Sequence, residues 1–263
     1  MNRRDFLHNA ALCVLLERPG QGAQAADCGD RFTIAASKGR QFLVSLFDPA
    51  IGLLPEYRDA RVFWLFHDNY LAAKVLEKGR SDLSLRLQKA IRNFGVTESG
   101  KIEIIFDEAK CPLPFRQPEL IQVKQLGEKT IKTEVLTDRE SKGWEDYADL
   151  LLLASISLSK TDAGAAKQRF NQALVMWDGM GLRDRATTKI GMYAVYKLAL
   201  VVMAAQRLNE HPAMMNGVVE RLLEQQAECG GWITDYTADG KPVGLANVET
   251  TSLAVLALDT LAR

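Results

Sequence analysis

The amino-acid sequence predicts a mainly α-helical protein, an incomplete α/α toroid of about four helical hairpins with a small antiparallel β insertion. Two observations lead to this fold class. Segments with a single apolar stripe alternate along the chain with segments that are apolar on nearly every face. The striped segments also recur at a nearly constant spacing, which is interrupted once.

Four segments carry one apolar stripe opposed by polar residues, as helices on a protein surface do. They cover residues 32 to 46, 81 to 94, 163 to 177 and 212 to 227. In the third segment the stripe consists of Ala166, Phe170, Ala173, Leu174 and Trp177. Successive segments begin about 49, 82 and 49 residues apart, within the usual uncertainty of helix ends. We predict that all four are outer helices.

The segments between them are apolar nearly all round, which predicts helices inside a packed ring or bundle. These runs are YLAAKVL from Tyr70, YADLLLLASISL from Tyr147, YAVYKLALVVMAA from Tyr193 and TTSLAVLALDTLA from Thr250. The natural unit is therefore an αα-hairpin of one outer and one inner helix. A right-handed solenoid of the same hairpins is the alternative arrangement.

One insertion accounts for the long middle step. Residues 101 to 137 contain three strand-like runs, KIEIIF, ELIQVKQL and KTIKTEVL, separated by proline-rich and Gly-Glu-Lys turns. We predict that these residues form a small antiparallel β element within the second repeat. Residues 26 to 263 are then a single domain.

The first residues predict export from the cytoplasm. MNRRDFL and the apolar run AALCVLL, which leads to Ala23-Gln24-Ala25, resemble a twin-arginine signal with an A-x-A cleavage site. Residues 1 to 25 would be removed, and the mature protein would be periplasmic or extracellular. Glu17 and Arg18 interrupt the apolar run, so the alternative is an amphipathic N-terminus on a cytoplasmic protein.

Composition excludes several classes of function. The chain has 33 basic and 33 acidic residues and no run of five like charges, which argues against nucleic acid as a partner. No stretch of about eighteen apolar residues occurs, so we expect no transmembrane span in the mature chain. Phosphate-loop, dinucleotide, serine-hydrolase and zinc-protease motifs are also missing from the sequence.

We predict no cofactor and no metal site. Beyond residue 25 the sequence has two histidines, His67 and His211, and no C-x-x-C pair. The three cysteines that remain after cleavage, Cys28, Cys111 and Cys229, allow one disulfide and one free thiol, and the pairing stays open.

Three loops between outer and inner helices resemble one another, FDPAIGLL, WDGMGLRD and CGGWITDY. Gly52, Gly181 and Gly231 each precede Leu or Trp in these loops. A glycine there allows a positive φ or a close backbone approach. A simple helix C-cap is the alternative explanation.

Aromatic and polar residues gather at the starts of the inner helices and in the loops before them. They are Glu56, Trp64, Asp68, Asn69, Trp144, Asp146, Tyr147, Tyr193, Tyr196, Lys197, Trp232, Asp235, Asn247 and Glu249. In the predicted fold these positions converge on one cleft. Aromatic rings beside carboxylates and amides suit the apolar faces and hydroxyls of a sugar. Helix capping is the alternative explanation for each acidic residue alone.

Asp68, Asp146 and Glu249 are the candidate catalytic residues, because paired carboxylates can cleave a glycosidic bond. A lyase mechanism would instead use Tyr193 or Tyr196 as the proton-transferring group, with Lys197 lowering its pKa. The tyrosines and the lysine can equally form a hydrogen-bonded brace between helices. The remaining residues of the set are predicted to bind ligand.

The runs WLFHDNYLAA, GKIEIIF, YKLAL and NVETTSLA together resemble an uncharacterised group of prokaryotic α/α-toroid proteins over most of residues 32 to 263. The broader similarity is to the toroid class of six-hairpin glycosidases and terpenoid cyclases. That similarity implies a helical ring with a cleft at one end. The chain has about four hairpins, and no catalytic motif of those enzymes matches it, so no catalytic residue is transferred.

The expected function is that of an exported protein that binds or acts on a carbohydrate, with an oligosaccharide or polysaccharide as partner. The first alternative is a noncatalytic protein-interaction or scaffolding module of the cell envelope, whose partner is unknown. The second is an enzyme of the cell envelope that acts on another small molecule. The sequence does not decide whether the protein is an enzyme.

Overall fold

The computed structural model describes residues 28 to 110 and 113 to 262. The described chain is mainly α-helical, as the sequence predicts. Its helices are α1 (Cys28–Ser45), the π-helix η2 (Leu65–Tyr70) followed by α2 (Leu71–Leu76), α3 (Ser81–Asn93), α4 (Ala148–Leu158), α5 (Ala163–Leu174), α6 (Arg185–Ile190), α7 (Val195–Leu208), α8 (Met215–Glu224) and α9 (Val248–Leu261). Two 3-10 helices, η3 (Ile102–Phe106) and η4 (Trp144–Asp146), and two small sheets complete the described elements.

The alternation of outer and inner helices is present. The outer helices are α1, α3, α5 and α8, and each buries one stripe; α3, for example, buries Leu83, Leu87, Ala90 and Ile91. The inner helices are α2, α4, α7 and α9. Helix α9 buries residues on every face between Val248 and Leu258. A helix of this kind has no side that it can leave in water.

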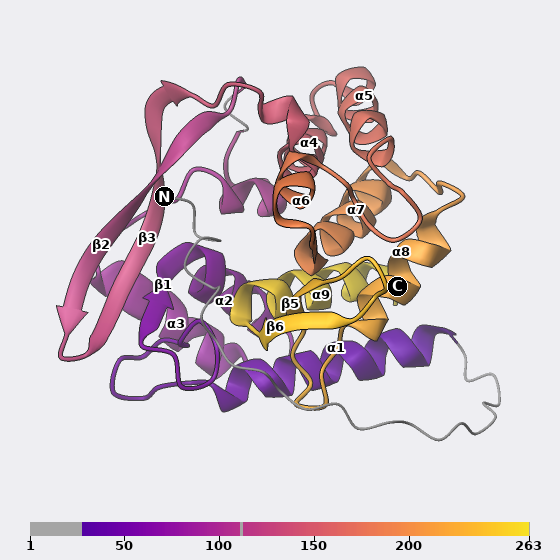
Figure 1. Cartoon of the computed structure of the whole chain (residues 1–263). Helices are drawn as coiled ribbons and strands as arrows, with labels where there is room; N and C mark the ends of the chain where they lie inside the picture. The colour runs from indigo at the N-terminus through magenta and orange to yellow at the C-terminus, as the bar shows by residue number, and fades with distance from the viewer. Residues whose placement is uncertain (1–27, 111–112, 263) are drawn as a thin grey trace.

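The inner helices form a row in which α4 contacts α7, α7 contacts α9, and α9 contacts α2. Each outer helix packs mainly on the inner helix that precedes it, so that α3 covers α2, α5 covers α4 and α8 covers α7. The first helix, α1, covers the last, α9, and the two lie side by side in Figure 1. Short inner-to-outer connections explain this pairing, because they join antiparallel neighbours. The units are therefore inner-outer hairpins, the reverse of the predicted order.

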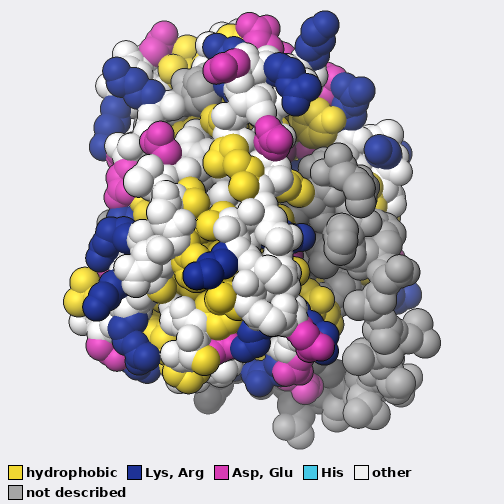
Figure 2. Space-filling view, turned by 90° about the vertical axis from the view of Figure 1, so that its left-hand side faces the viewer, with side chains coloured by type: hydrophobic (Ala, Val, Ile, Leu, Met, Phe, Trp, Pro, Cys, Tyr) yellow, Lys and Arg dark blue, Asp and Glu magenta, His cyan; other side chains and the backbone are white. Residues whose placement is uncertain are grey.

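The predicted insertion is a hairpin of β2 (Arg116–Leu126) and β3 (Lys129–Glu140), which pair antiparallel. The three-residue strand β1 (Val62–Trp64) joins β3 in parallel and gives the order β1-β3-β2. The hairpin forms one side of the molecule in Figure 1. Figure 2 views this side, on which apolar side chains lie among charged ones.

The prediction that KIEIIF is a strand is wrong. Residues Ile102–Phe106 form the 3-10 helix η3, which packs on α4 and buries Ile102, Ile104 and Ile105. A short apolar run has no periodicity that separates a strand from a buried helical turn. Among the described residues no strand pairs with this run, and the β structure of the insertion begins at Arg116.

The last loop contains structure that the sequence analysis does not predict. Strands β4 (Tyr193–Ala194), β5 (Ile233–Tyr236) and β6 (Pro242–Ala246) form a second antiparallel sheet of order β4-β5-β6. Through this sheet, the glycine-rich loop before α9 is attached to the residues that lead into α7. The starts of these two inner helices are thereby held together.

The three similar loops have one local structure. Each is closed by an isolated β-bridge, Asp48 with Leu53, Trp177 with Leu182, and Gln226 with Trp232. The prediction for the glycines before these bridges is confirmed. Gly52 has a φ of +81°, and a Cβ on Gly181 would lie 2.4 Å from Cδ1 of Tyr193. Neither position accepts a side chain without strain.

A buried ion pair ties three helices together. The Lys197 ammonium of α7 pairs with the Asp184 carboxylate, and their side chains are 1% and 0% exposed. The same carboxylate accepts the backbone N–H groups of Thr187, at 2.9 Å, and of Ala148, at 3.1 Å. Asp184 thus caps α6, contacts the start of α4 and neutralises Lys197. The pair fixes where α4 and α7 begin.

We expect Asp184→Ala to lower the free energy of unfolding by about 3–5 kcal/mol, because it leaves the Lys197 ammonium buried without its counter-ion. Urea unfolding followed by circular dichroism measures this change. Glu228→Ala, at an exposed position, is the control and should stay within about 0.5 kcal/mol of the wild type. A comparably small change for Asp184→Ala would contradict the role given to the pair.

Asp48 connects the first loop to the hairpin. Its Oδ1 accepts the N–H groups of Ala50, at 2.9 Å, and Ile51, at 3.3 Å, and Oδ2 pairs with Lys129 of β3. Burial on its own raises the pKa of Asp48, but the Lys129 hydrogen bond and the two N–H groups outweigh it. The pKa of this carboxyl therefore lies below its ordinary value.

A pKa lowered by folding means that the Asp48 carboxylate stabilises the protein above its unfolded pKa of about 3.9. That contribution is lost as the pH falls through the folded pKa. We expect the wild type to lose more stability between pH 6 and pH 3 than Asp48→Asn does, since the asparagine keeps the caps but does not titrate. Urea unfolding at each pH tests this, and parallel pH profiles would refute it.

Candidate functional site

A cavity of about 170 Å³ lies at the N-terminal ends of the inner helices. Three of these helices, α4, α7 and α9, contribute one wall, and the rest comes from η2, η3, α6, β3, β4, β5 and the loops. The sequence predicts a cleft at this end of the helices. The cavity is where the side chains of the inner helix starts converge.

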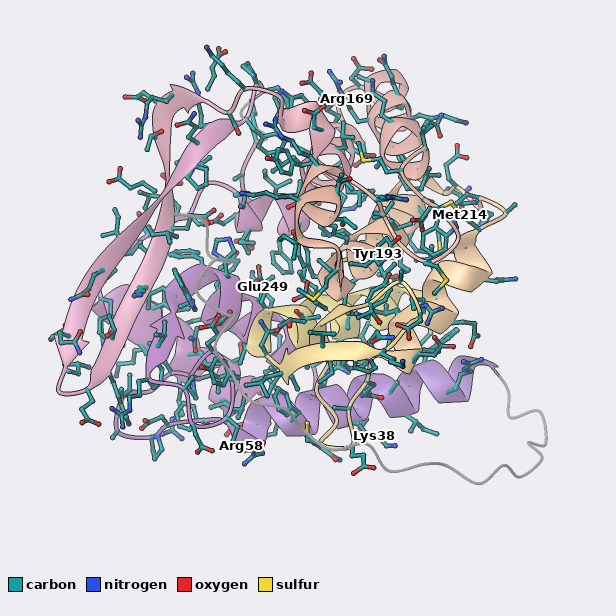
Figure 3. All side chains as sticks on the ribbon, in the orientation of Figure 1. Lys38, Arg58, Arg169, Tyr193, Met214 and Glu249 are labelled. Carbon is teal, nitrogen blue, oxygen red and sulfur yellow. The ribbon has the colours of Figure 1, made fainter. Side chains whose placement is uncertain are left out.

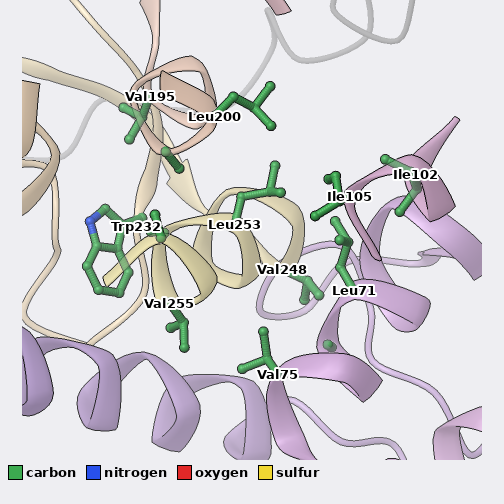
Figure 4. Packing of buried hydrophobic residues seen from close by; sticks show 14 of the residues in the cluster. Leu71, Val75, Ile102, Ile105, Val195, Leu200, Trp232, Val248, Leu253 and Val255 are labelled. Carbon is green, nitrogen blue, oxygen red and sulfur yellow. The ribbon is translucent and has the colours of Figure 1, made fainter. Parts of the chain in front are cut away.

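The three helices contribute equivalent positions to the cavity. Asp149, Tyr196 and Glu249 are each the second residue of their helix, and all three line the cavity. One turn further along the same face, Leu153, Leu200 and Leu253 line it as well. Each helix thus adds a polar group from its second position and a leucine one turn further on. Figure 4 shows Leu253 and Leu200 with Ile105 of η3, which also belongs to the lining.

Hydrogen bonds fix the polar groups of this wall. The Tyr196 hydroxyl donates to Oδ2 of Asp149 at 2.9 Å and so connects α7 to α4 inside the cavity. Asn247 caps α9 by accepting the Thr250 N–H at 2.9 Å. In Figure 3 Glu249 extends from the start of α9 toward the middle of the molecule.

The remaining wall carries an ion pair between η3 and the hairpin. Lys101, at the N-cap of η3, places Nζ 2.8 Å from Oε1 of Glu134 on β3. His67 of η2 lies on the same carboxylate, with Nε2 3.6 Å from Oε1. All three residues line the cavity. The inserted residues therefore build part of the site.

Carboxylates from both walls of the cavity affect the pKa of Lys101. Burial alone lowers the pKa of this lysine. Glu134 raises it, and so do the charges of Asp149 and Glu249, with the result that the pKa lies above its ordinary value. Lys101 is therefore an ammonium at neutral pH.

Six of the residues predicted from the sequence line the cavity, namely Glu56, Tyr147, Tyr196, Asp235, Asn247 and Glu249. Glu56 also ties the first loop to the last helix, because its carbonyl accepts the Val248 N–H at 3.0 Å. The other eight predicted residues lie elsewhere.

Two of the three candidate catalytic residues do not reach the cavity. Asp68 is fully buried in η2, because this segment forms a π-helix that precedes α2 and turns the side chain into the protein. Asp146 belongs to η4 and faces solvent, 3.4 Å from the guanidinium of Arg185. Of the three, only Glu249 lines the cavity.

The tryptophans and Asn69 belong to the core. The Trp232 indole is fully buried and donates to the Leu222 carbonyl at 2.8 Å, and Trp144 packs edge-on against Phe115. Trp64 is buried as well. Asn69 accepts the Leu54 N–H at 2.7 Å and donates to the carbonyls of Leu54 and Trp64. All three rings are therefore part of the hydrophobic core and do not line the cavity.

Tyr193 and Lys197 form the brace that was the alternative to a lyase mechanism. The Tyr193 hydroxyl donates to Asp178, and its ring stacks on Tyr236 with 5.4 Å between centroids. Burial and the Asp178 carboxylate raise the pKa of Tyr193 to about 12. A hydroxyl with a raised pKa and an acidic partner is poorly suited to remove a proton. The Lys197 ammonium forms an ion pair with the Asp184 carboxylate.

Sequence reasoning missed His67, Lys101, Glu134 and Asp149 as residues of the site. Asp149 had a detectable signal, since the inner helices begin ADL, VYK and VET, and each run has a polar residue at its second position. The other three lie on η2, η3 and β3, and no local pattern relates them. Only the packing of the insertion against the helices brings them together.

Within residues 28 to 110 and 113 to 262, no group of three His, Cys, Asp or Glu side chains could hold a metal ion. No helix in these ranges is long and apolar enough to cross a membrane. Cys229 is an exposed free thiol. The predicted export signal, Cys111 and the side chain of Cys28 fall outside what the structure describes.

Comparisons with protein-family models, with curated proteins and with solved structures find no match to this chain. The resemblance to α/α toroids therefore rests on the sequence runs given above. The function has to be inferred from the cavity itself.

Glu134 keeps Lys101 charged against the effect of burial. We expect Glu134→Gln to lower the pKa of Lys101, because the largest factor that raises it is removed. Carbon-detected NMR titration of labelled lysine measures the pKa. Glu128→Gln, on the exposed hairpin turn, should leave it unchanged. An unaltered Lys101 pKa in Glu134→Gln would contradict the charge assignment of the cavity.

Proposed function

We propose that this chain is an exported protein that binds a carbohydrate in the cavity at the inner helix starts. We also propose that its helices form an incomplete α/α toroid. The contacts of α1 and α2 with α9 support the toroid, because they join the first and last repeats. In a solenoid each repeat contacts only its neighbours, which would leave those ends apart.

The arrangement of Asp149, Tyr196 and Glu249 above three leucines carries the proposal. A pyranose has an apolar C–H face and a rim of hydroxyls. A cavity with an apolar floor and carboxylates, a phenol and an amide around it offers partners for both. Tyr147 and Asn247 add two further neutral groups that can bond hydroxyls.

The volume of the cavity, about 170 Å³, limits the size of the ligand that can enter it. A single water occupies about 10–15 Å³ on the same measure of volume. A cavity about ten times larger admits one sugar unit or the end of a chain. We therefore propose a monosaccharide or a terminal sugar residue as the part of the ligand that enters.

Cleavage of a bound sugar would need two carboxylates. Glu249 and Asp149 are the pair that the helical wall offers, in place of the pair of Glu249 with Asp68 or Asp146 expected from the sequence. The charges of both carboxylates raise the pKa of the same group, the Lys101 ammonium.

Isothermal titration of the purified protein with a panel of mono- and oligosaccharides tests the proposal. We expect saturable binding by at least one of them, weakened at least tenfold in Glu249→Gln, because a hydrogen bond to a charged group contributes about 1.5–3 kcal/mol. Glu228→Gln is the matched control and should bind like the wild type. Urea unfolding of each variant confirms that it is folded.

No binding to the panel by a folded wild-type protein would refute the carbohydrate proposal. The protein-interaction alternative would then be favoured. The edge strand β2, where Leu120 and Ile121 are each 39% exposed, offers a surface for a protein partner. Binding that survives in Glu249→Gln would place the sugar outside the cavity.

A further inference from the structure

The inner end of the cavity indicates which sugars it accepts. Resting on the proposed function, we propose that the cavity prefers a 6-deoxy sugar, in which a methyl group replaces the hydroxymethyl group of a hexose, to the parent hexose. Five aliphatic side chains at the inner end of the cavity support this preference.

Polar and aliphatic side chains lie at different depths along the helical wall. The polar second residues of α4, α7 and α9 are half-buried. The leucines one turn further along these helices, Leu153, Leu200 and Leu253, line the cavity and are 4%, 2% and 2% exposed. A ligand that enters between the helix starts therefore meets polar groups first and leucines last.

Two isoleucines lie across from these leucines. Ile102 and Ile105 of η3 line the cavity and are 4% and 3% exposed. Figure 4 shows them on one side, with Leu200 and Leu253 on the other. The inner end of the cavity thus has aliphatic carbon on two sides, and we call it the aliphatic slot.

A slot of this kind selects a group that is apolar all round. The C–H face of a pyranose is apolar on one side only, because hydroxyls surround the ring. The C6 substituent projects from the ring, and in a 6-deoxy sugar it is a methyl group. In the parent hexose, the hydroxyl on C6 would exchange its hydrogen bonds to water for contacts with leucine and isoleucine, which is unfavourable. Lys101, which precedes Ile102 in the chain, already pairs with Glu134 at 2.8 Å.

Sets of three sugars that share every ring hydroxyl test the preference. Each set contains a hexose, its 6-deoxy form and the pentose that lacks C6. The sets are glucose, quinovose and xylose; galactose, fucose and arabinose; and mannose, rhamnose and lyxose, matched in ring configuration and measured in both enantiomeric series. Isothermal titration of the purified protein gives the dissociation constants.

We expect the 6-deoxy sugar of a set that binds to bind at least about fivefold more tightly than the hexose, because it buries no hydroxyl in the slot. It should bind about three- to fourfold more tightly than the pentose, which has no methyl group to bury. Equal or tighter binding of the hexose overturns the preference. Equal binding of the pentose also overturns it, since the methyl group would then lie outside the slot.

Variants of the slot locate the effect. Ile105→Thr and Ile102→Thr each place a hydroxyl in the slot and should reduce the ratio of 6-deoxy sugar to hexose affinity at least about threefold. Ile121→Thr, the same change at a position of β2 that is 39% exposed, is the matched control and should preserve the ratio. Urea unfolding shows which variants are folded. An unchanged ratio in a folded slot variant would overturn the assignment of the methyl group to the slot, and the wild-type ratios test the preference without any variant.

The outcomes separate the preference from the function on which it rests. A wild-type protein that binds hexose and 6-deoxy sugar equally would retain carbohydrate binding and lose the preference. The complementary probe is 4-methylcyclohexanol, a ring with a methyl group and a single hydroxyl. If it binds as tightly as the 6-deoxy sugar, the slot is confirmed and the carbohydrate function fails. No binding by any of the sugars or by this alcohol overturns both.

Discussion

The inner helices have no polar side, and this constraint organises the molecule. Helices α4, α7 and α9 bury residues around their whole circumference, so that each must be covered by other elements along its length. Polar groups can then gather only at the helix ends. Because the N-terminal ends of these helices converge, their second residues, Asp149, Tyr196 and Glu249, surround one cavity.

Buried polar side chains in the first turns hold these ends in register. Lys197 pairs with Asp184, the Asn69 amide bonds both backbone groups of Leu54, and Thr251 accepts the Trp232 N–H at 2.9 Å. In each case a residue at or just before the start of an inner helix is tied to the loop that precedes it.

The two walls of the cavity have different origins and different chemistry. The helical wall repeats one pattern of a polar group and a leucine, as expected where similar hairpins surround a common centre. The other wall comes from η2, η3 and the hairpin, and it brings the ion pair of Lys101 with Glu134. This division allows the helices to determine the shape of the site, while the insertion and the acidic helix starts determine its charge.

The sequence by itself determined the classes of helix and the place of the hairpin. Apolar periodicity distinguishes an outer helix such as α3 from an inner helix such as α9. The spacing of the apolar residues along the chain determines whether a helix buries one face or all of them. It also identified Glu249, Tyr196 and Asn247, which belong to regular helix starts. Tertiary structure alone decided that KIEIIF is helical, that α1 covers α9, and that Trp232 and Lys197 face inward. Lys101 and Glu134 meet for the same reason. Such outcomes depend on contacts between residues distant in the chain, and local sequence does not encode which neighbour a side chain will find.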